Sequence, residues 1–340
     1  MIKYEIPNFI YEVLAEPLSV IFSFFNESVK SGIFPDDLKK ARVTPIFKKG
    51  DRSNIENFRP ISNLPFLAKV LEKLMLTRLN SFITQKCILS PRQFGFKSGS
   101  CTSDAILEFL DQIYKSLDKR ALFLSIFLDL RRAFDTVDHR VLLGKLDAYG
   151  IRGVANNWFG SYLFNRQQYV KVGNSCSELK TICLGVPQGA VLAPLLFNLY
   201  INDMSNCCQD LCLIHYADDT TAFLAGSCIE NIFAVANRYL ENIQVWLQSN
   251  RLSLNVPKTN FMLFGYVPPT VRVPNLIIPG ENIHISEKSN FLGIVIDHKL
   301  TFEAHVNELL TKLSRVSGVL WRSRNLAPKT VRKSIYFSLA

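Results

Sequence analysis

The stretch that most constrains the fold is residues 211–224, which read LCLIHYADDTTAFL. Two runs of apolar and β-branched residues flank the adjacent carboxylates Asp218 and Asp219, a pattern typical of a β-hairpin with both acids at its tip. Two such charges repel each other by about 1 kcal/mol at 4 Å in water, and by more where water is excluded. We therefore expect a cation at this tip. A tight turn without a functional role is the other interpretation, since Asp is common in turns.

Length and composition fit a large globular chain. Of the 340 residues, 48% are hydrophobic and 20% are charged, which argues against disorder and favours one large domain with subdomains. The longest apolar stretch, residues 184–201, is interrupted by two prolines and a glutamine, so we expect no membrane span. Without a signal-peptide pattern or a paired cysteine framework, we expect an intracellular, reduced protein. The cysteines and histidine at 207–215 lack the spacing of a zinc site.

Basic residues are concentrated in two places. The net charge is +10, residues 39–59 hold seven Lys or Arg, and residues 309–340 hold seven more with no acid. A basic chain of this kind indicates a polyanionic partner such as nucleic acid. An anionic membrane surface, or simply a solvated face, is the alternative.

A second acid follows a strand that the sequence predicts to be buried. Residues 121–130 (ALFLSIFLDL) are almost continuously apolar, which is typical of a strand covered on both faces. Asp129 ends this run. A carboxylate there is unfavourable unless it is solvated, paired or bound to a metal. Capping of the helix that follows is the structural alternative.

Periodicity and turn residues predict the remaining elements. Ser103 or Asp104 is the expected N-cap of the helix at 105–117. We expect helices at 8–30, 64–82, 105–117, 150–165, 190–203 and 230–248. One more helix should follow the turn at 131–135 and end at about 149. We expect strands at 42–47, 168–172, 179–183, within 252–264 and at 290–297.

Two segments can present groups to a nucleotide. Residues 42–62 form a hairpin-like element whose cations, carried on a fixed frame, could converge on one phosphate group. The loop Gly185-Val186-Pro187-Gln188-Gly189 combines glycines, which allow close approach, with an amide that both donates and accepts hydrogen bonds. An exposed basic hairpin and an ordinary helix-entry loop are the alternatives.

Taken in order, these pieces resemble the reverse transcriptases of non-LTR (LINE-type) retrotransposons. The similarity covers about residues 30–335. Seven ordered motifs are far more specific than any one of them. They are FKKGD with NFRPIS, QFGF, FLDLRRAFDTVDH, GVPQGAVLAPLLFNLYINDM, YADDTTAF, LSLNVPKTNFM and FLGIVID.

The resemblance implies a role for each matching residue. Asp129, Asp218 and Asp219 correspond to the catalytic carboxylates that hold two Mg²⁺ ions, with Mn²⁺ as a possible substitute. Phe134 corresponds to the bulky gate against a ribose 2′-hydroxyl, and Gln188 to a residue that lines the nucleotide pocket.

The remaining matches concern the triphosphate and the primer. Lys48 or Lys49, with Arg59, corresponds to the cations that meet the incoming triphosphate. Lys258 corresponds to a lysine that assists the leaving pyrophosphate, and residues 291–293 correspond to the primer grip.

The resemblance also implies a fold and a reaction. We expect an α+β right-hand polymerase: an N-terminal helical extension at 1–36, interleaved fingers and palm with a mainly antiparallel sheet at 37–300, and a partial helical thumb at 301–340. The expected partners are an RNA template, a DNA primer and dNTPs, with no membrane. Two-metal phosphoryl transfer requires mainly positioning and charge neutralisation. An enzyme of this kind would act in the nucleus.

The chain departs from the family pattern in small ways. Ala193 replaces a common glycine and Cys101 a common serine. We also expect no endonuclease region before the polymerase and a thumb shorter than usual. A catalytically silent nucleic-acid-binding remnant is therefore one alternative, and an RNA-dependent RNA polymerase, which Phe134 argues against, is another.

Overall fold

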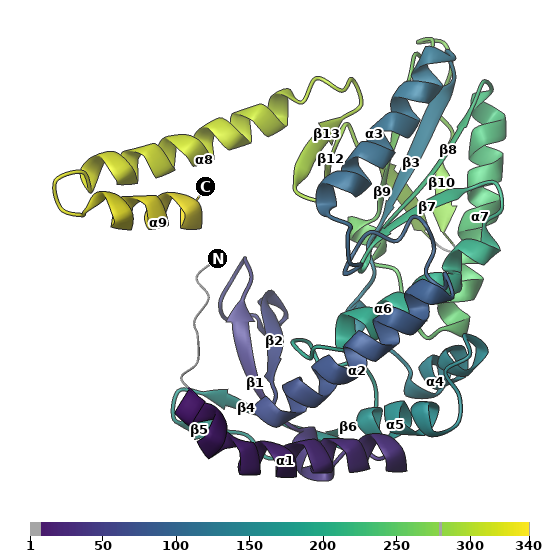
Figure 1. The fold of residues 1–340 in the computed structure, drawn as a ribbon. Coiled ribbons are helices and arrows are strands. Elements are labelled where there is room, and N and C mark those ends of the chain that lie inside the picture. Colours follow the sequence, from purple (N-terminus) through teal and green to yellow (C-terminus); the bar gives the residue numbers. More distant parts are fainter. Residues whose placement is uncertain (1–7, 279–280, 340) are drawn as a thin grey trace.

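A computed structural model describes residues 8–278 and 281–339. Helices and strands are interleaved along the chain. The strands form two main sheets, and the helices pack against these sheets and connect them (Figure 1). The helices are α1 (Asn8–Ser31), α2 (Phe66–Gln85), α3 (Thr102–Asp118), α4 (His139–Ala148), α5 (Val154–Leu163), α6 (Ala193–Ile201), α7 (Ile229–Ser249), α8 (Glu303–Arg322) and α9 (Lys329–Leu339).

The larger sheet has strand order β10-β11-β9-β3-β8-β7 and is antiparallel except where β9 meets β11. Its central strand β3 alternates between two cores. Phe123 and Phe127 pack with residues of α3 on one face, whereas Leu124, Ile126 and Leu128 join the main core with residues of α6 and α7 on the other. The predicted burial of this strand on both faces is confirmed. The strands are β3 (Leu122–Leu128), β7 (Cys212–Tyr216), β8 (Asp219–Gly226), β9 (Asn260–Phe264), β10 (Leu276–Ile278) and β11 (Glu281–Ile285).

The smaller sheet is built on the predicted basic hairpin. β1 and β2 pair antiparallel, β4 adds parallel to β1, and β5 and β6 pair with β4. Behind this sheet, α1 packs on α5, where Trp158 donates a hydrogen bond to Ser28 at 3.1 Å. The strands are β1 (Lys40–Phe47), β2 (Phe58–Asn63), β4 (Arg166–Val172), β5 (Ser175–Cys176) and β6 (Lys180–Ile182).

Two local predictions were wrong. Residues 290–297 are not one strand but lie in a hairpin of β12 (Lys288–Phe291) and β13 (Ile294–Asp297), because Leu292 and Gly293 take left-handed φ values of +50° and +90°. Helix α3 starts earlier than expected. Its N-cap is Cys101, and Asp104 acts from the third helical position, where its carboxylate accepts the Cys101 N–H at 2.7 Å.

The C-terminal helices α8 and α9 extend away from the larger sheet and lie across from the β1–β2 hairpin (Figure 1). Asp297 fixes the start of this extension, because its carboxylate accepts backbone N–H groups of Lys299, Thr301 and Phe302 at 2.8 to 3.1 Å. Among the described residues of the two helices, Val316 is the one that is buried. No helix within the described ranges is long and apolar enough to cross a bilayer.

The predicted hairpin with acids at its tip is confirmed. β7 and β8 pair until Tyr216 faces Asp219, which leaves Ala217 and Asp218 to make the turn. Ala217 has a left-handed φ of +57°. A residue with a side chain rarely adopts this conformation, so neighbouring contacts must hold the turn in place.

Those contacts come from the segment at 92–95. Phe94 donates its N–H to the His215 carbonyl at 2.9 Å, so the segment runs along the free edge of β7. Gly95 then lies against the turn, where a Cβ atom would stand 2.2 Å from the Ala217 nitrogen. Asn198 of α6 donates to the Gly95 carbonyl at 2.7 Å. Gly95 therefore packs directly against the backbone of the turn, at a position where a side chain does not fit.

We expect Gly95→Ala to destabilise the protein by about 2 kcal/mol, because the added methyl group must push the backbone of the turn. Urea unfolding measures this difference. Gly144→Ala is the matched control, since a Cβ atom there meets nothing within 4 Å and alanine favours the helix. Equal urea midpoints for Gly95→Ala and the wild type would contradict the tight packing of the turn.

Candidate active site

The three predicted aspartates lie together at one end of the larger sheet. The pairing of β3 with β8 ends at Leu128 and Thr220, and the same register continued by one residue sets Asp129 opposite Asp219. Opposed residues of antiparallel strands have Cα atoms about 5 Å apart. Asp218 adjoins Asp219 in the turn. The register of a single strand pair thus brings together acids that are about ninety residues apart in the sequence.

Residues that follow α7 hold Asp129 in place. Asn255 binds it twice, since its side-chain amide donates to the Asp129 carboxylate at 2.7 Å and its N–H donates to the Asp129 carbonyl at 2.8 Å. Lys258 Nζ lies 3.8 Å from the same carboxylate. The Asp129 N–H donates to the Thr259 hydroxyl at 3.3 Å. The carboxylate therefore has a fixed orientation and one cation beside it.

The carboxylates at this end disfavour one another's charge. Desolvation, together with the charges of Asp218 and Asp129, raises the pKa of Asp219 to about 6, and the charge of Lys48 opposes the rise. The acids are therefore close enough to interact strongly. Among the described residues, however, no three His, Cys, Asp or Glu side chains converge as a ready-made metal cage.

The predicted cations of the β1–β2 hairpin face these acids. Desolvation lowers the pKa of Lys48, and the charges of Arg59, Lys258 and Lys49 lower it further, whereas Asp129 raises it. The hairpin sets this arrangement, because the Lys48 N–H donates to the Asn57 carbonyl at 2.8 Å and keeps the two strands paired. Lys48 thus lies near Asp129 and Asp219, and three further cations, Lys49, Arg59 and Lys258, lie near Lys48.

The loop that carries Gln188 binds the segment that carries Phe134, since the Val186 N–H donates to the Phe134 carbonyl at 2.8 Å. The ring of Phe134 stacks on Phe197 of α6, with centroids 4.5 Å apart and planes 25° apart. The side chain of Gln188 donates to Asp135 at 2.8 Å, and its carbonyl accepts the Ser62 N–H of β2 at 2.7 Å. The loop that carries Gln188 therefore bridges the two sheets.

Three residues at the site received no role from the sequence. Gly95 lies in the quoted QFGF motif, between two phenylalanines, but the motif gave it no role of its own. Asn255 and Asp135 lie within two of the quoted motifs, but polar residues near turns are common and the motifs alone gave neither residue a role. Their roles depend on contacts with Asp129 and Gln188, which lie more than fifty residues away.

Comparison with known proteins gives the same family over most of the chain. The model of the family described as reverse transcriptase (RNA-dependent DNA polymerase) matches residues 46–296. The chain is 31% identical over 309 residues to a probable RNA-directed DNA polymerase from transposon X-element of Drosophila melanogaster, covering 87% of this chain and 33% of that protein. It is 28% identical over 344 residues to the RNA-directed DNA polymerase from mobile element jockey of the same organism, covering 95% and 36%.

The fold is similar to that of a solved polymerase. The structure of apo telomerase from Candida tropicalis, truncated from the C-terminal domain, matches with a TM-score of 0.55 and 15% identity, covering 80% of this chain and 55% of that one. The predicted α+β right-hand polymerase fold is thereby confirmed. The chain spans about a third of the length of the curated relatives it matches. It belongs to the reverse transcriptase family and is related to the RNA-directed DNA polymerases of non-LTR retrotransposons.

Proposed function

We propose that this chain adds deoxynucleoside monophosphates to the 3′ end of a DNA primer on an RNA template and releases pyrophosphate. The observation that supports this proposal best is the position of Asp129 opposite Asp219, with Asp218 beside them and Lys48 of the β1–β2 hairpin near Asp129 and Asp219. Phosphoryl transfer requires groups that neutralise charge and hold the reactants in line, and this site supplies both signs of charge.

The aspartates fit divalent cations. Carboxylate oxygens are the ligands that Mg²⁺ prefers, and Mg²⁺ is usually held by one or two carboxylates with substrate phosphates rather than by an all-protein cage. Desolvation and the charges of Asp218 and Asp129 raise the pKa of Asp219, and a bound cation would favour its charged form. We assign Asp129, Asp218 and Asp219 as ligands for two Mg²⁺ ions, with Mn²⁺ as a substitute. When bound, the ions would activate the primer hydroxyl and stabilise the leaving pyrophosphate.

The cations around the aspartates suit a triphosphate. Lys48, Lys49 and Arg59 come from one rigid hairpin, so they can bind one polyphosphate without a large loss of conformational freedom. Lys258 is held near Asp129 and is placed to assist the pyrophosphate as it leaves. All four side chains are exposed, so a triphosphate can reach them.

Phe134 is the gate against ribonucleotides in this proposal. Its ring is half-buried and rests on Phe197, so it cannot retreat from an extra hydroxyl on the sugar without losing this stacking. We assign Gln188 to the same nucleotide site, because its side chain binds Asp135, the residue that follows Phe134. Deoxynucleotides are therefore the expected substrates.

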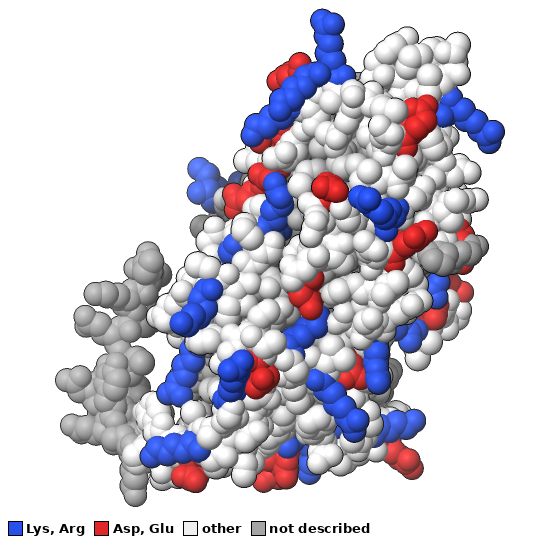
Figure 2. Space-filling view, turned by 90° about the vertical axis from the view of Figure 1, so that its right-hand side faces the viewer, with Lys and Arg blue, Asp and Glu red and all other residues white. Residues whose placement is uncertain are grey.

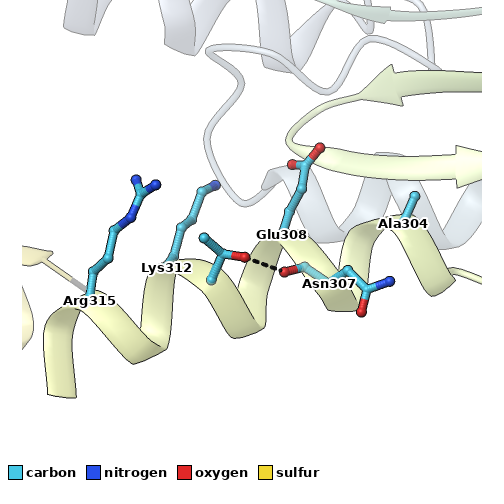
Figure 3. A pocket seen from close by; sticks show the side chains of 6 residues that line it. Ala304, Asn307, Glu308, Lys312 and Arg315 are labelled. Carbon is cyan, nitrogen blue, oxygen red and sulfur yellow. Dashed lines mark hydrogen bonds between the residues drawn. The ribbon is translucent and has the colours of Figure 1, made fainter. Parts of the chain in front are cut away.

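The C-terminal helices offer a surface for the primer–template duplex. On the face that Figure 2 shows, Lys and Arg are interspersed with Asp and Glu. Residues 309–340, by contrast, hold seven basic residues and no acid. On α8, Lys312 and Arg315 extend to the same side as Glu308 and line a pocket there (Figure 3). We assign residues 301–340 as thumb, 37–300 as fingers and palm, and 1–36 as an N-terminal extension, and we place the reaction in the nucleus.

We expect Asp218→Asn to lower dNTP incorporation by more than about a hundredfold, because it removes one charge that would hold the metal ions. Incorporation on a poly(rA)/oligo(dT) duplex with Mg²⁺ measures this. Asp111→Asn is the matched control, since Asp111 pairs with Lys115 on the surface of α3.

Equal, background incorporation by the wild type and Asp218→Asn would end the claim of polymerase activity. If the chain then still bound the duplex with a steep salt dependence, it would be a silent nucleic-acid-binding remnant.

Replacing Phe134 with alanine should raise the use of ribonucleotides relative to deoxynucleotides by roughly 10- to 100-fold, because the space for a 2′-hydroxyl opens. The ratio of kcat/KM values for GTP and dGTP is the measurement. The same ratio is measured for Phe197→Leu, which removes the ring that supports Phe134 but keeps Phe134 itself. An unchanged preference in Phe134→Ala would remove the gate assignment.

Binding of Mn²⁺ or Mg²⁺ should depend on pH. Because the pKa of Asp219 is raised to about 6, the carboxyl group is protonated below that pH and the metal must displace a proton. Apparent affinity should fall about tenfold for each pH unit below 6 and level off above about 7. Mn²⁺ titration followed by electron paramagnetic resonance tests this, and Asp219→Asn should bind weakly at every pH. A flat profile for the wild type would show that Asp219 is not a ligand.

A further inference from the structure

Asp135 directly follows the proposed gate and carries a contact that the polymerase mechanism above does not use. Its Oδ1 atom accepts a hydrogen bond from Nε2 of Gln188 at 2.8 Å. Both side chains are half-buried. Desolvation raises the pKa of Asp135, while the bond from Gln188 and the charge of Arg132 lower it. The side chain on which Asp135 acts is the one assigned to the nucleotide pocket.

The backbone of the Gln188 loop is fixed without help from Asp135's side chain. Val186 donates its N–H to the Phe134 carbonyl at 2.8 Å, and Gly185 donates to the Val137 carbonyl at 2.8 Å. On the other side, the Gln188 carbonyl accepts the Ser62 N–H. The Asp135 carboxylate therefore orients the side-chain amide of Gln188, whereas backbone hydrogen bonds set the path of the loop.

The chemistry of the two groups decides that orientation. An ionised carboxylate only accepts hydrogen bonds, whereas an amide has a donor end and an acceptor end. Asp135 therefore selects the arrangement in which Nε2 faces it, and the carbonyl oxygen Oε1 lies at the other end of the amide. Within the described part of the chain, Oε1 has no hydrogen-bond partner.

We propose that Asp135 is a positioning residue that fixes Gln188 as a hydrogen-bond acceptor for the incoming nucleotide. This inference rests on the proposed function, because it needs a nucleotide in the pocket. It also narrows what Gln188 recognises. Phosphate oxygens only accept hydrogen bonds, so the acceptor end of Gln188 meets a donor on the nucleotide, a hydroxyl of the sugar or an amino group of the base.

Equilibrium binding of a dNTP tests the inference without chemistry. The full chain is bound to an RNA template and a primer that ends in a dideoxynucleotide, so that no bond can form. We expect Asp135→Ala to raise the dNTP Kd by about tenfold, the usual effect of one lost hydrogen bond. Asp135→Asn should raise it only about twofold, because asparagine accepts from Nε2 or donates to Oε1 and the competent orientation falls to about half.

A double-mutant cycle separates positioning from an independent role. If Asp135 acts through Gln188, Asp135→Ala should weaken binding no further in a chain that already carries Gln188→Ala. Asp111→Ala is the matched control and should leave the Kd unchanged, since Asp111 lies on the surface of α3. Asp135→Asn keeps the size of the side chain, so it serves if Asp135→Ala fails to fold.

Each outcome decides the matter. If Asp135→Ala weakens dNTP binding about tenfold in the wild-type background but not in the Gln188→Ala background, Asp135 is a positioning residue. This conclusion holds even if the wild type binds dNTP without incorporating it, and that result would overturn only the proposed function. Tighter binding by Asp135→Ala would mean that Asp135 holds Gln188 away from the nucleotide, and additive effects would mean that Asp135 acts on its own. Either result overturns the inference. A wild type that binds no dNTP overturns both the inference and the proposed function.

Discussion

Mutual repulsion among three carboxylates is the constraint on which the site depends. The register of β3 against β8 sets Asp129 opposite Asp219 and next to Asp218, and the charges of these two neighbours add to desolvation in raising the pKa of Asp219. Such an arrangement is unfavourable in the absence of cations, so the rest of the structure must hold it together. The hydrogen bonds of Asn255 to Asp129 and the packing of Gly95 under the turn supply this support.

The two cores around β3 make that support rigid. Because the strand is buried on both faces, it cannot slide by one residue without exchanging every side chain between two apolar environments. The register that aligns the aspartates is therefore fixed by residues with no chemical role, such as Phe123 and Leu124. Burial of β3 on both faces therefore both stabilises the sheet and fixes the positions of the aspartates at its end.

The smaller sheet depends on the larger one through few but specific contacts. Gln188 bonds to Ser62 on one side and to Asp135 on the other, and the buried carboxylate of Glu72 in α2 accepts the N–H groups of Val191 and Leu192 at the entry to α6. Burial raises the pKa of Glu72, while those backbone bonds lower it. The loop at 185–189 is thus held by the contacts of Gln188, and the start of α6 after it is held by Glu72. These contacts fix how the β1–β2 hairpin lies relative to the segment that follows Asp129.

Local pattern determined much of this protein. The hairpin at 211–224, the strand at 121–130 and the basic hairpin followed from the sequence alone, because alternation, burial and turn residues act over a few neighbours. Ordered motifs gave the family, and the strand register brings the candidate carboxylates Asp129 and Asp219 opposite each other. Tertiary structure alone decided the pairing of Asp135 with Gln188, the support of Ala217 by Gly95 and the hairpin of β12 and β13. These features join residues far apart in sequence or rest on left-handed backbone at single positions, and hydrophobic periodicity carries no information about either.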